Sequence, residues 1–331
     1  MLKKTLTGMM FFWGTACWVL GAAVPLPDVQ IIPWNGHKAA VSLTFDDSDP
    51  SHLDVAIPEL NQRKMRGTFY LIANRTDRKD EWRQALTQGH ELGNHTLDHK
   101  HANELTARDE EAQVMGAQNV LQKEFGVPIR TFAYPYSDIT PTLKAWVGKG
   151  HLLARGGYGD YDMKPASEPD WLNIPSRNTM TALPIATYRD WIDQDLKDNA
   201  WLVFVIHGLE GTPWGWEPIT RQNFEAILDY LQSKDIWVET FLGVGSYFRA
   251  EKVFESCQVN TADDKRTWDW NIPENFPTQV VLCLRIKPNA DGSVPSVELS
   301  QGGNILTPDD TGLYRFNFSG KELVMRLLPK R

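Results

Sequence analysis

Apolar and polar residues follow one another along the first 250 residues in a pattern that predicts repeated β-α units. Largely apolar runs at 39–45, 67–72 and 201–206 predict strands, and the last run, six apolar residues without interruption, is typical of a strand buried on both faces. Between such runs, apolar residues recur at helical spacing, as they do within segment 50–63. Further strands are expected at 129–133 and 236–240, with further helices around 82–86, at 106–126, from 140, at 184–197, at 220–233 and up to 248.

The pattern changes after about residue 250, where helical periodicity disappears. Segments 279–286, 296–300, 313–318 and 322–328 alternate like strands between turns rich in Gly, Pro, Asn and Asp. We therefore expect an α/β chain in which residues 24–250 form an irregular (β/α) barrel. A smaller all-β, sandwich-like domain is expected over residues 251–331.

The N-terminus has the pattern of an export signal over residues 1–23. Lys3 and Lys4 precede an uncharged run that ends in the small residues 21–23. We expect export to the periplasm or the extracellular space, with no stable membrane partner after cleavage. An uncleaved anchor is the alternative, because the run is almost as long as the shortest spanning helix. A lipoprotein linked through Cys17 is less favoured, because Gly14 stands where a large aliphatic residue is expected.

Three cysteines bear on the redox state of the exported protein. Signal cleavage would remove Cys17 and leave Cys257 and Cys283 in an oxidising compartment, where a disulfide can persist. The sequence leaves their pairing open.

The net charge limits which classes of molecule the protein can bind as main partners. A formal net charge of −8 and a pI of about 5.5 provide no general cationic field, which excludes nucleic acid and acidic membrane surfaces as main partners. A hydrophobic content of 42% can form a sizeable core, so the chain is not disordered overall. Thirteen Trp residues are suited to stacking on sugar rings, although most Trp side chains simply pack in a core.

Paired carboxylates follow the first predicted strand. The segment Thr44-Phe45-Asp46-Asp47 places two acids at its carboxyl end, just before a turn. Adjacent carboxylates repel each other, so the pair is costly unless a cation or a shared proton relieves the repulsion. An Asp pair that caps a helix is the alternative, and this motif alone leaves both interpretations open.

Two histidines four residues apart form the second candidate. His95 and His99 lie on one helical face or in one tight turn, where both imidazoles can reach the same ion. A chance pair is not rare in a chain with eight His. Together with one carboxylate, however, the pair makes a two-His, one-carboxylate set with open positions for water and substrate.

With these motifs, the sequence resembles the polysaccharide deacetylases of carbohydrate esterase family 4, over about residues 38–250. The resemblance implies that Asp46 is the catalytic base and Asp47 a metal ligand, with His95 and His99 as the other two ligands. Zinc is the favoured ion, and a two-His, one-carboxylate site also accepts cobalt, nickel or iron.

Two further motifs extend the resemblance. Phe132-Ala133-Tyr134-Pro135-Tyr136 matches the family's third motif, which implies that Pro135 and Tyr136 contact substrate and that the Tyr136 backbone N–H binds the oxyanion. An aliphatic strand that ends in His207 matches the motif of the acid histidine. The implied reaction is metal-assisted hydrolysis of an acetyl group, with Asp46 as base and His207 as acid.

The sequence also departs from the family pattern. Ala133 stands where an Arg usually braces the base, and Arg177 is our candidate for that role, with a plain surface arginine as the alternative. Asp170, in Asp170-Trp171, is the candidate to orient His207. Ser48 replaces the usual Gly after the paired acids.

Several residues near the motifs have open roles. Trp214 and Trp216, in a Gly-rich loop after His207, are candidates for stacking on substrate at the rim of the site. His52 and His101 could be extra ligands or substrate contacts, and solvent-exposed polar residues are the favoured alternative. In the β domain, Trp268 and Trp270 could bind carbohydrate or pack in the core.

The expected function is removal of acetyl groups from a glycan substrate, with an N-acetylglucosamine polymer or oligomer favoured. An O-acetyl esterase that acts on a xylan-type polysaccharide is the alternative with the same chemistry. A non-catalytic glycan-binding protein, suggested by Ala133, is the alternative from another class, and the intact acid, base and ligand set argues against it.

Overall fold

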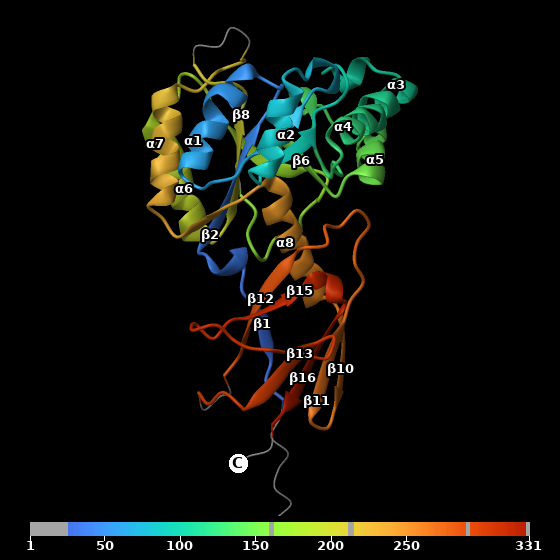
Figure 1. The fold of residues 1–331 in the computed structure, drawn as a ribbon, viewed down its shortest axis with the longest axis vertical. Coiled ribbons are helices and arrows are strands. Elements are labelled where there is room, and N and C mark those ends of the chain that lie inside the picture. Colours follow the sequence, from blue (N-terminus) through green and yellow to red (C-terminus); the bar gives the residue numbers. More distant parts are fainter. Residues whose placement is uncertain (1–25, 159–161, 211–214, 289–291, 329–331) are drawn as a thin grey trace, which may run out of the picture.

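The structure is a computed structural model that describes residues 26–158, 162–210, 215–288 and 292–328. Two parts are visible in Figure 1, a barrel with surrounding helices and a β region below it. Among the described residues, no helix combines the length and apolar character needed to cross a membrane. The export signal expected at 1–23 lies outside the described residues.

Seven parallel strands, β2 to β8, close into a ring, as the sequence predicted for a (β/α) barrel. The ring closes where the end of β2 pairs with β3, Thr44 lying opposite Thr68, while β9 pairs with the start of β2. The strands are β2 (Ala39–Phe45), β3 (Thr68–Leu71), β4 (Glu91–Asn94), β5 (Thr131–Ala133), β6 (Leu153–Tyr158), β7 (Ile174–Asn178), β8 (Trp201–Ile206) and β9 (Ile236–Val238). The bounds predicted for β2 and β8 are confirmed, whereas β4 and β6 were not predicted.

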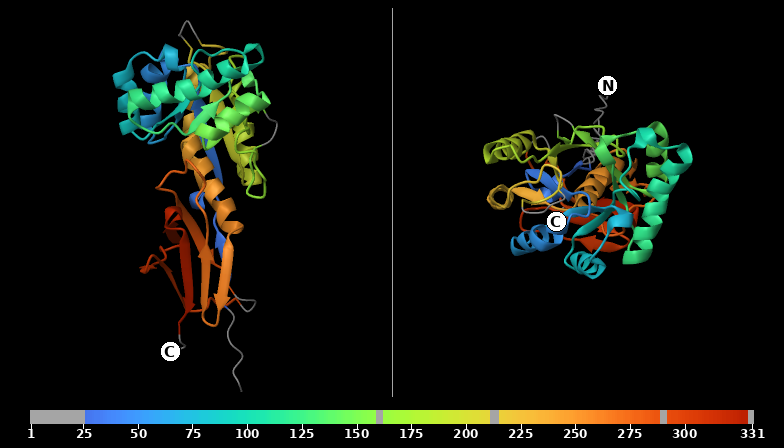
Figure 2. Two further views of the ribbon diagram at one scale, coloured as in Figure 1. Left: turned by 90° about the vertical axis from the view of Figure 1, so that its right-hand side faces the viewer. Right: turned by 90° about the horizontal axis from the view of Figure 1, so that it is seen from above.

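Helices surround the barrel, as the view along its axis shows (Figure 2). They are α1 (Ile57–Gln62), α2 (Lys79–Thr87), α3 (Ala107–Glu111), α4 (Ala117–Phe125), α5 (Pro141–Gly150), α6 (Ile185–Asp198) and α7 (Arg221–Gln232). Wider helical turns at His52–Ala56 and Ala112–Gly116 lead directly into α1 and α4. Thr106 caps α3 in a reciprocal pair with Asp109, which satisfies backbone donors at the helix start.

Helix α8 (Phe241–Glu255) leaves the barrel and runs into the β region (Figures 1 and 2). It extends past residue 248, the end expected from the sequence. Its later turns continue because Ala250 and Phe254 are buried against the β region rather than exposed to solvent. The helix therefore joins the two parts through one shared core.

The β region consists of two antiparallel sheets, in agreement with the predicted all-β part. Five strands form one sheet: β10 (Gln258–Ala262), β11 (Lys265–Asp269), β16 (Glu322–Leu327), β13 (Val297–Gln301) and β14 (Asn304–Leu306). The other sheet contains β1 (Val29–Ile31), β12 (Val281–Ile286) and β15 (Tyr314–Asn317). Because β1 pairs with β12, the segment around residues 29–31 belongs to this region and not to the barrel, which differs from the predicted 24–250 unit.

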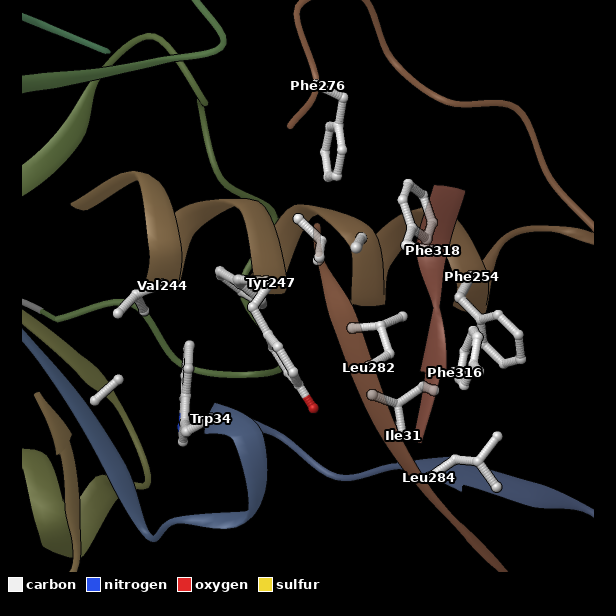
Figure 3. Close-up of a cluster of buried hydrophobic side chains, with 14 of the residues drawn as sticks. Ile31, Trp34, Val244, Tyr247, Phe254, Phe276, Leu282, Leu284, Phe316 and Phe318 are labelled. Atoms are coloured by element: carbon white, nitrogen blue, oxygen red, sulfur yellow. The ribbon is translucent and has the colours of Figure 1, made fainter. Parts of the chain in front are cut away.

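The core between α8 and the sheets is largely aromatic (Figure 3). Phe254 lies 5.3 Å from Phe316 between ring centroids, and Trp34 lies 5.2 Å from Phe248. Trp268 and Trp270, the candidates for carbohydrate binding, are each 5% exposed and pack in this core instead. Cys257 and Cys283 are free thiols in the structure.

Candidate active site

The predicted functional residues meet at the carboxyl ends of the barrel strands. Asp46 and Asp47 follow β2, His95 follows β4 and His207 follows β8, and in a closed parallel barrel these ends lie on one face. A cavity of about 420 Å³ opens there. Its lining comprises Asp46, Asp47, His95, His99, Tyr134, Tyr136, Ser137, Arg155, Gly156, Ser176, Val205, His207 and Trp216.

One carboxylate oxygen and two imidazole nitrogens converge in this cavity. Asp47 Oδ1 lies 3.5 Å from His95 Nε2 and 3.2 Å from His99 Nε2. The three possible ligand atoms all lie within 4.8 Å of one another. The structure therefore brings together the three residues that the sequence proposed as metal ligands.

The donor atoms are oriented for an ion. The His95 Nδ1–H donates to the Ala133 carbonyl over 2.9 Å, so its Nε2 lone pair faces Asp47. Asp47 Oδ1 is buried and accepts no hydrogen bond from the described residues, an arrangement that is costly unless a cation takes that place. These side chains therefore fit a divalent ion.

The protonation states of Asp47 and His99 agree with this fit. Burial acts to lower the pKa of His95, but the carboxylates of Asp46 and Asp47 raise it overall, so an ion bound there displaces a proton. Burial acts to raise the pKa of Asp47, but His95 and His99 outweigh it and hold the pKa well below its usual range. Burial and the neighbouring His95 lower the pKa of His99 to about 4. At neutral pH, His99 is accordingly a neutral imidazole and Asp47 an anion, the forms that bind a metal.

Arg155 braces the candidate base. Its guanidinium donates to Asp46 in a bidentate pair, with Nη1 to Oδ1 at 2.9 Å and Nη2 to Oδ2 at 2.5 Å, and Nη1 also donates to Thr44 Oγ1 at 3.0 Å. Burial acts to raise the pKa of Asp46, but Arg155 and His95 lower it overall, so the carboxylate stays ionised. Both members of this pair are nearly inaccessible to solvent, so the orientation of the base is closely defined.

The sequence assigned this brace to Arg177, and the structure corrects that assignment. The Arg177 guanidinium instead donates to both carboxylate oxygens of Asp162, at 3.0 and 3.1 Å. Arg155 was missed because it lies on β6, where Gly156 and Gly157 weaken the strand pattern. The apolar run 152–154 just before Arg155 is the signal that could have identified β6 and its polar end.

His207 faces the base from the end of the neighbouring strand β8. Its Nε2 lies 4.0 Å from Asp46 Oδ2, and Trp216 packs against its ring with centroids 4.9 Å apart. Burial lowers the pKa of His207, and this effect exceeds the opposing effect of Asp46. Asp170, the predicted orienting residue, does not contact it: the half-exposed Asp170 carboxylate pairs with Lys144 and accepts the Leu172 N–H.

The turn at Tyr136 forms one wall of the cavity. Tyr136 and Ser137 have φ of 54° and 61°, left-handed values that are uncommon for residues other than glycine. The Tyr136 ring is 51% exposed and stacks on His101, with centroids 3.6 Å apart, while His101 Nδ1 lies 2.8 Å from Asp138 Oδ2. His101 is therefore a partly buried support of this wall rather than an isolated exposed residue.

Of the two predicted stacking residues, one is described. Trp216 lines the cavity with half of its surface exposed. Trp214 lies outside the described residues. Pro135 is buried in the turn beneath Tyr136, so the part of this motif that reaches the cavity is Tyr136.

Comparisons with known proteins support the family resemblance. Residues 35–152 match the family model described as polysaccharide deacetylase. A peptidoglycan-N-acetylglucosamine deacetylase from Bacillus cereus is 31% identical over 95 residues, which are 28% of this chain and 45% of that protein. A chitooligosaccharide deacetylase from Sinorhizobium fredii is 33% identical over 97 residues, which are likewise 28% of this chain and 45% of that protein.

A solved structure shows the same fold. A Mycobacterium smegmatis protein assigned to the polysaccharide deacetylases superposes with a TM-score of 0.56 at 16% identity, over 69% of this chain and 95% of that chain. This chain spans less than half the length of the first curated relatives that it matches. The likeness is concentrated in the barrel that carries the site.

Proposed function

We propose that the polysaccharide deacetylase domain of this chain removes acetyl groups from a glycan by metal-assisted hydrolysis. The observation that carries the proposal is the convergence of Asp47, His95 and His99 beside Asp46, whose carboxylate Arg155 holds in a bidentate pair. A divalent ion bound by this triad would supply Lewis-acid polarisation of the acetyl carbonyl and acidify water.

The remaining steps belong to the chain's own residues. Asp46 accepts a proton from the attacking water, since its low pKa and the Arg155 pair keep it ionised. His207, at the end of the neighbouring strand, delivers a proton to the leaving amine or alcohol. Tyr136 and Trp216 present exposed aromatic faces on which a sugar ring can stack.

Within this chemistry we favour N-acetyl groups on an N-acetylglucosamine-containing glycan, with zinc as the ion and an exported protein. The named activities of the Bacillus cereus and Sinorhizobium fredii relatives support the choice of substrate. A non-catalytic glycan-binding protein was suggested because Ala133 cannot brace the base. This alternative is disfavoured, because Arg155 braces Asp46 instead.

Acetate release tests the proposal. The zinc-loaded protein is assayed on chitooligosaccharide and on acetylated xylan, with and without a chelator, with Asp46→Asn as the matched inactive control. We expect chelator-sensitive release from chitooligosaccharide that Asp46→Asn lacks. Release from acetylated xylan alone would identify an O-acetyl esterase in place of an N-deacetylase. If neither substrate releases acetate and the protein still binds them, the glycan-binding alternative is favoured.

A further inference from the structure

Two loops at the carboxyl end of the barrel are joined by buried hydrogen bonds. The turn after β2 leads through Ser51 to His52, and the neighbouring strand β8 ends at Ile206, just before His207. His52 Nε2 lies 2.7 Å from the His207 carbonyl oxygen, and the Leu209 N–H donates to Ser51 Oγ over 3.0 Å. The backbone on both sides of Gly208 is therefore held by the loop that also carries Asp46 and Asp47.

The supporting side chains are buried and held in turn. His52 is 0% exposed, Ser51 1% and Asp49 3%, so none of them serves as a solvated surface residue. Ser51 Oγ–H donates to Asp49 Oδ1 over 2.5 Å, which leaves the oxygen free to accept from Leu209. Because a carbonyl can only accept, His52 carries its proton on Nε2.

Close packing fixes the same geometry. The buried His52 ring packs against two aromatic rings, with centroids 5.3 Å from Phe45 and 5.7 Å from Phe69, which restricts its rotation away from the His207 carbonyl. A side chain at Gly208 would meet the Gly215 Cα at 3.1 Å and Asp49 Oδ2 at 3.3 Å. The backbone at residue 208 is therefore seated directly on this support.

The imidazole of His207 is held differently from the carboxylate of Asp46. Its Nδ1 is buried and has no hydrogen-bond partner among the described residues, and Asp170 is directed elsewhere. The direction of the ring then depends on its backbone and on packing against Trp216. Holding the His207 carbonyl consequently controls where Nε2 points.

We propose that His52 is a positioning residue for the acid His207, acting through the His207 backbone carbonyl, with Ser51 and Asp49 as its supports. In this arrangement one loop carries the base, a metal ligand and the support of the acid. The inference rests on the proposed function, because it assigns His52 to the proton-donating half of that reaction. A small displacement of a catalytic group can lower a rate by about 10²-fold, so a buried support at this position matters.

The test compares two substrates in wild type and four variants. His52→Leu removes the donor while keeping an apolar side chain of similar reach, and His52→Gln restores an N–H near the same place. His90→Leu is the matched control, since His90 is 3% exposed and also packs on Phe69, at 5.6 Å, but does not line the cavity. His207→Ala defines the pattern expected when the acid is lost.

We expect His52→Leu to lower turnover of an N-acetylated oligosaccharide by about 10- to 100-fold, and that of 4-nitrophenyl acetate by less than about threefold, because a good leaving group needs little protonation. Zinc content should equal that of wild type, His52→Gln should recover most of the lost rate, and His90→Leu should slow both substrates alike. Equal losses on the two substrates in His52→Leu would overturn the inference. If His52→Leu does not fold, Ser51→Ala must lower turnover of the N-acetylated oligosaccharide more than that of 4-nitrophenyl acetate.

A second measurement separates this inference from the proposed function. The ¹H–¹³C imidazole resonance of His207, assigned by its loss in His207→Ala, should shift in His52→Leu and stay in place in His90→Leu. An unchanged resonance would count against His52 even in an active enzyme. Absence of acetate release from wild type would instead refute the proposed function. The His207 resonance would then still test whether His52 positions His207.

Discussion

Two buried polar side chains of the aromatic core, at one end of the barrel, are hydrogen-bonded, whereas two side chains of the cavity, at the other end, each leave a buried atom without a partner among the described residues. In the core, the Trp34 Nε1–H donates to the Asn199 carbonyl at 2.9 Å, and the Tyr247 hydroxyl donates to the Ile32 carbonyl at 2.6 Å. In the cavity, Asp47 Oδ1 and His207 Nδ1 are buried without hydrogen-bond partners among the described residues. The first arrangement stabilises the fold, whereas the second leaves groups available for a ligand.

Several residues at the cavity have a left-handed backbone conformation, as Trp34 has in the core. Asp47, Thr96, His99 and Tyr136 all have φ between 54° and 75°, which costs free energy for residues with a side chain. The barrel strands and the packed helices hold these turns in place. The close packing beneath the cavity therefore supports the turns whose backbone is strained.

The largest effect is expected where the base or a metal ligand is removed. Asp46→Asn should abolish measurable turnover yet keep zinc content near wild type, because Asp46 is not part of the ligand triad. His95→Ala should lose both turnover and zinc, since it removes one of three ligand atoms. Metal analysis beside an acetate assay checks this, and equal metal loss in both variants would contradict the separation of base and ligand.

Breaking the brace of the base should have the next largest effect. Arg155→Ala leaves the buried Asp46 carboxylate without its guanidinium, so we expect turnover to fall by about 10²-fold or more and the free energy of unfolding to fall by about 3–5 kcal/mol. Arg177→Ala is the matched control, because it breaks a partly buried pair with Asp162 away from the cavity lining. Turnover that falls equally in both variants would restore Arg177 as a candidate.

Two Trp substitutions test whether a Trp in the core stabilises the fold while a Trp at the cavity binds substrate. Trp270→Ala should lower the free energy of unfolding by about 3–5 kcal/mol, because it removes a buried ring that also donates to the Phe318 carbonyl. Trp216→Ala should leave stability nearly unchanged and raise KM by roughly tenfold, through loss of a stacking face worth about 1–1.5 kcal/mol. Urea unfolding and oligosaccharide kinetics measure both, and a large KM effect from Trp270→Ala would revive carbohydrate binding by the β region.

The smallest expected effect concerns Glu91 at the base of the barrel. Glu91 accepts hydrogen bonds from Thr68 Oγ1 at 2.7 Å and from the Leu242 N–H at 2.9 Å, which anchors the start of α8. Burial raises the pKa of Glu91 to about 7, above its ordinary value of 4.5. Because the folded state keeps this proton longer than the unfolded chain, stability should decrease as pH rises from about 4.5 to about 7, by on the order of 3 kcal/mol, and then level off.

Glu91→Gln carries no titratable proton, so it should flatten that part of the pH profile. Urea unfolding of the chelated protein at pH 5 and pH 7.5 isolates this group from metal binding. Relative to Glu91→Gln, wild type should lose on the order of 3 kcal/mol of stability between pH 5 and pH 7.5 if Glu91 is responsible. A difference that is the same at both pH values would show that Glu91 is already ionised in the folded protein.

Much of the fold could be predicted from periodicity. Strands β2 and β8 were predicted with their observed bounds, because both are long apolar runs between clear turns. Strand β4 contains Glu91 and Asn94, and strand β6 contains Arg155 and two glycines, so neither has an apolar pattern. Pairing with neighbouring strands, rather than local preference, decides these elements.

Local sequence determined which residues could do chemistry here: Asp46, Asp47 and His207 follow strands with strong apolar patterns, and His95 and His99 stand out by their spacing although the strand before them, β4, has no such pattern. Only the tertiary structure decided how these groups are held. Arg155 reaches Asp46 from a strand 109 residues away, and His52 reaches the carbonyl of His207 across 155 residues. Such contacts depend on barrel closure and side-chain packing, and a pattern of neighbouring residues carries no information about either.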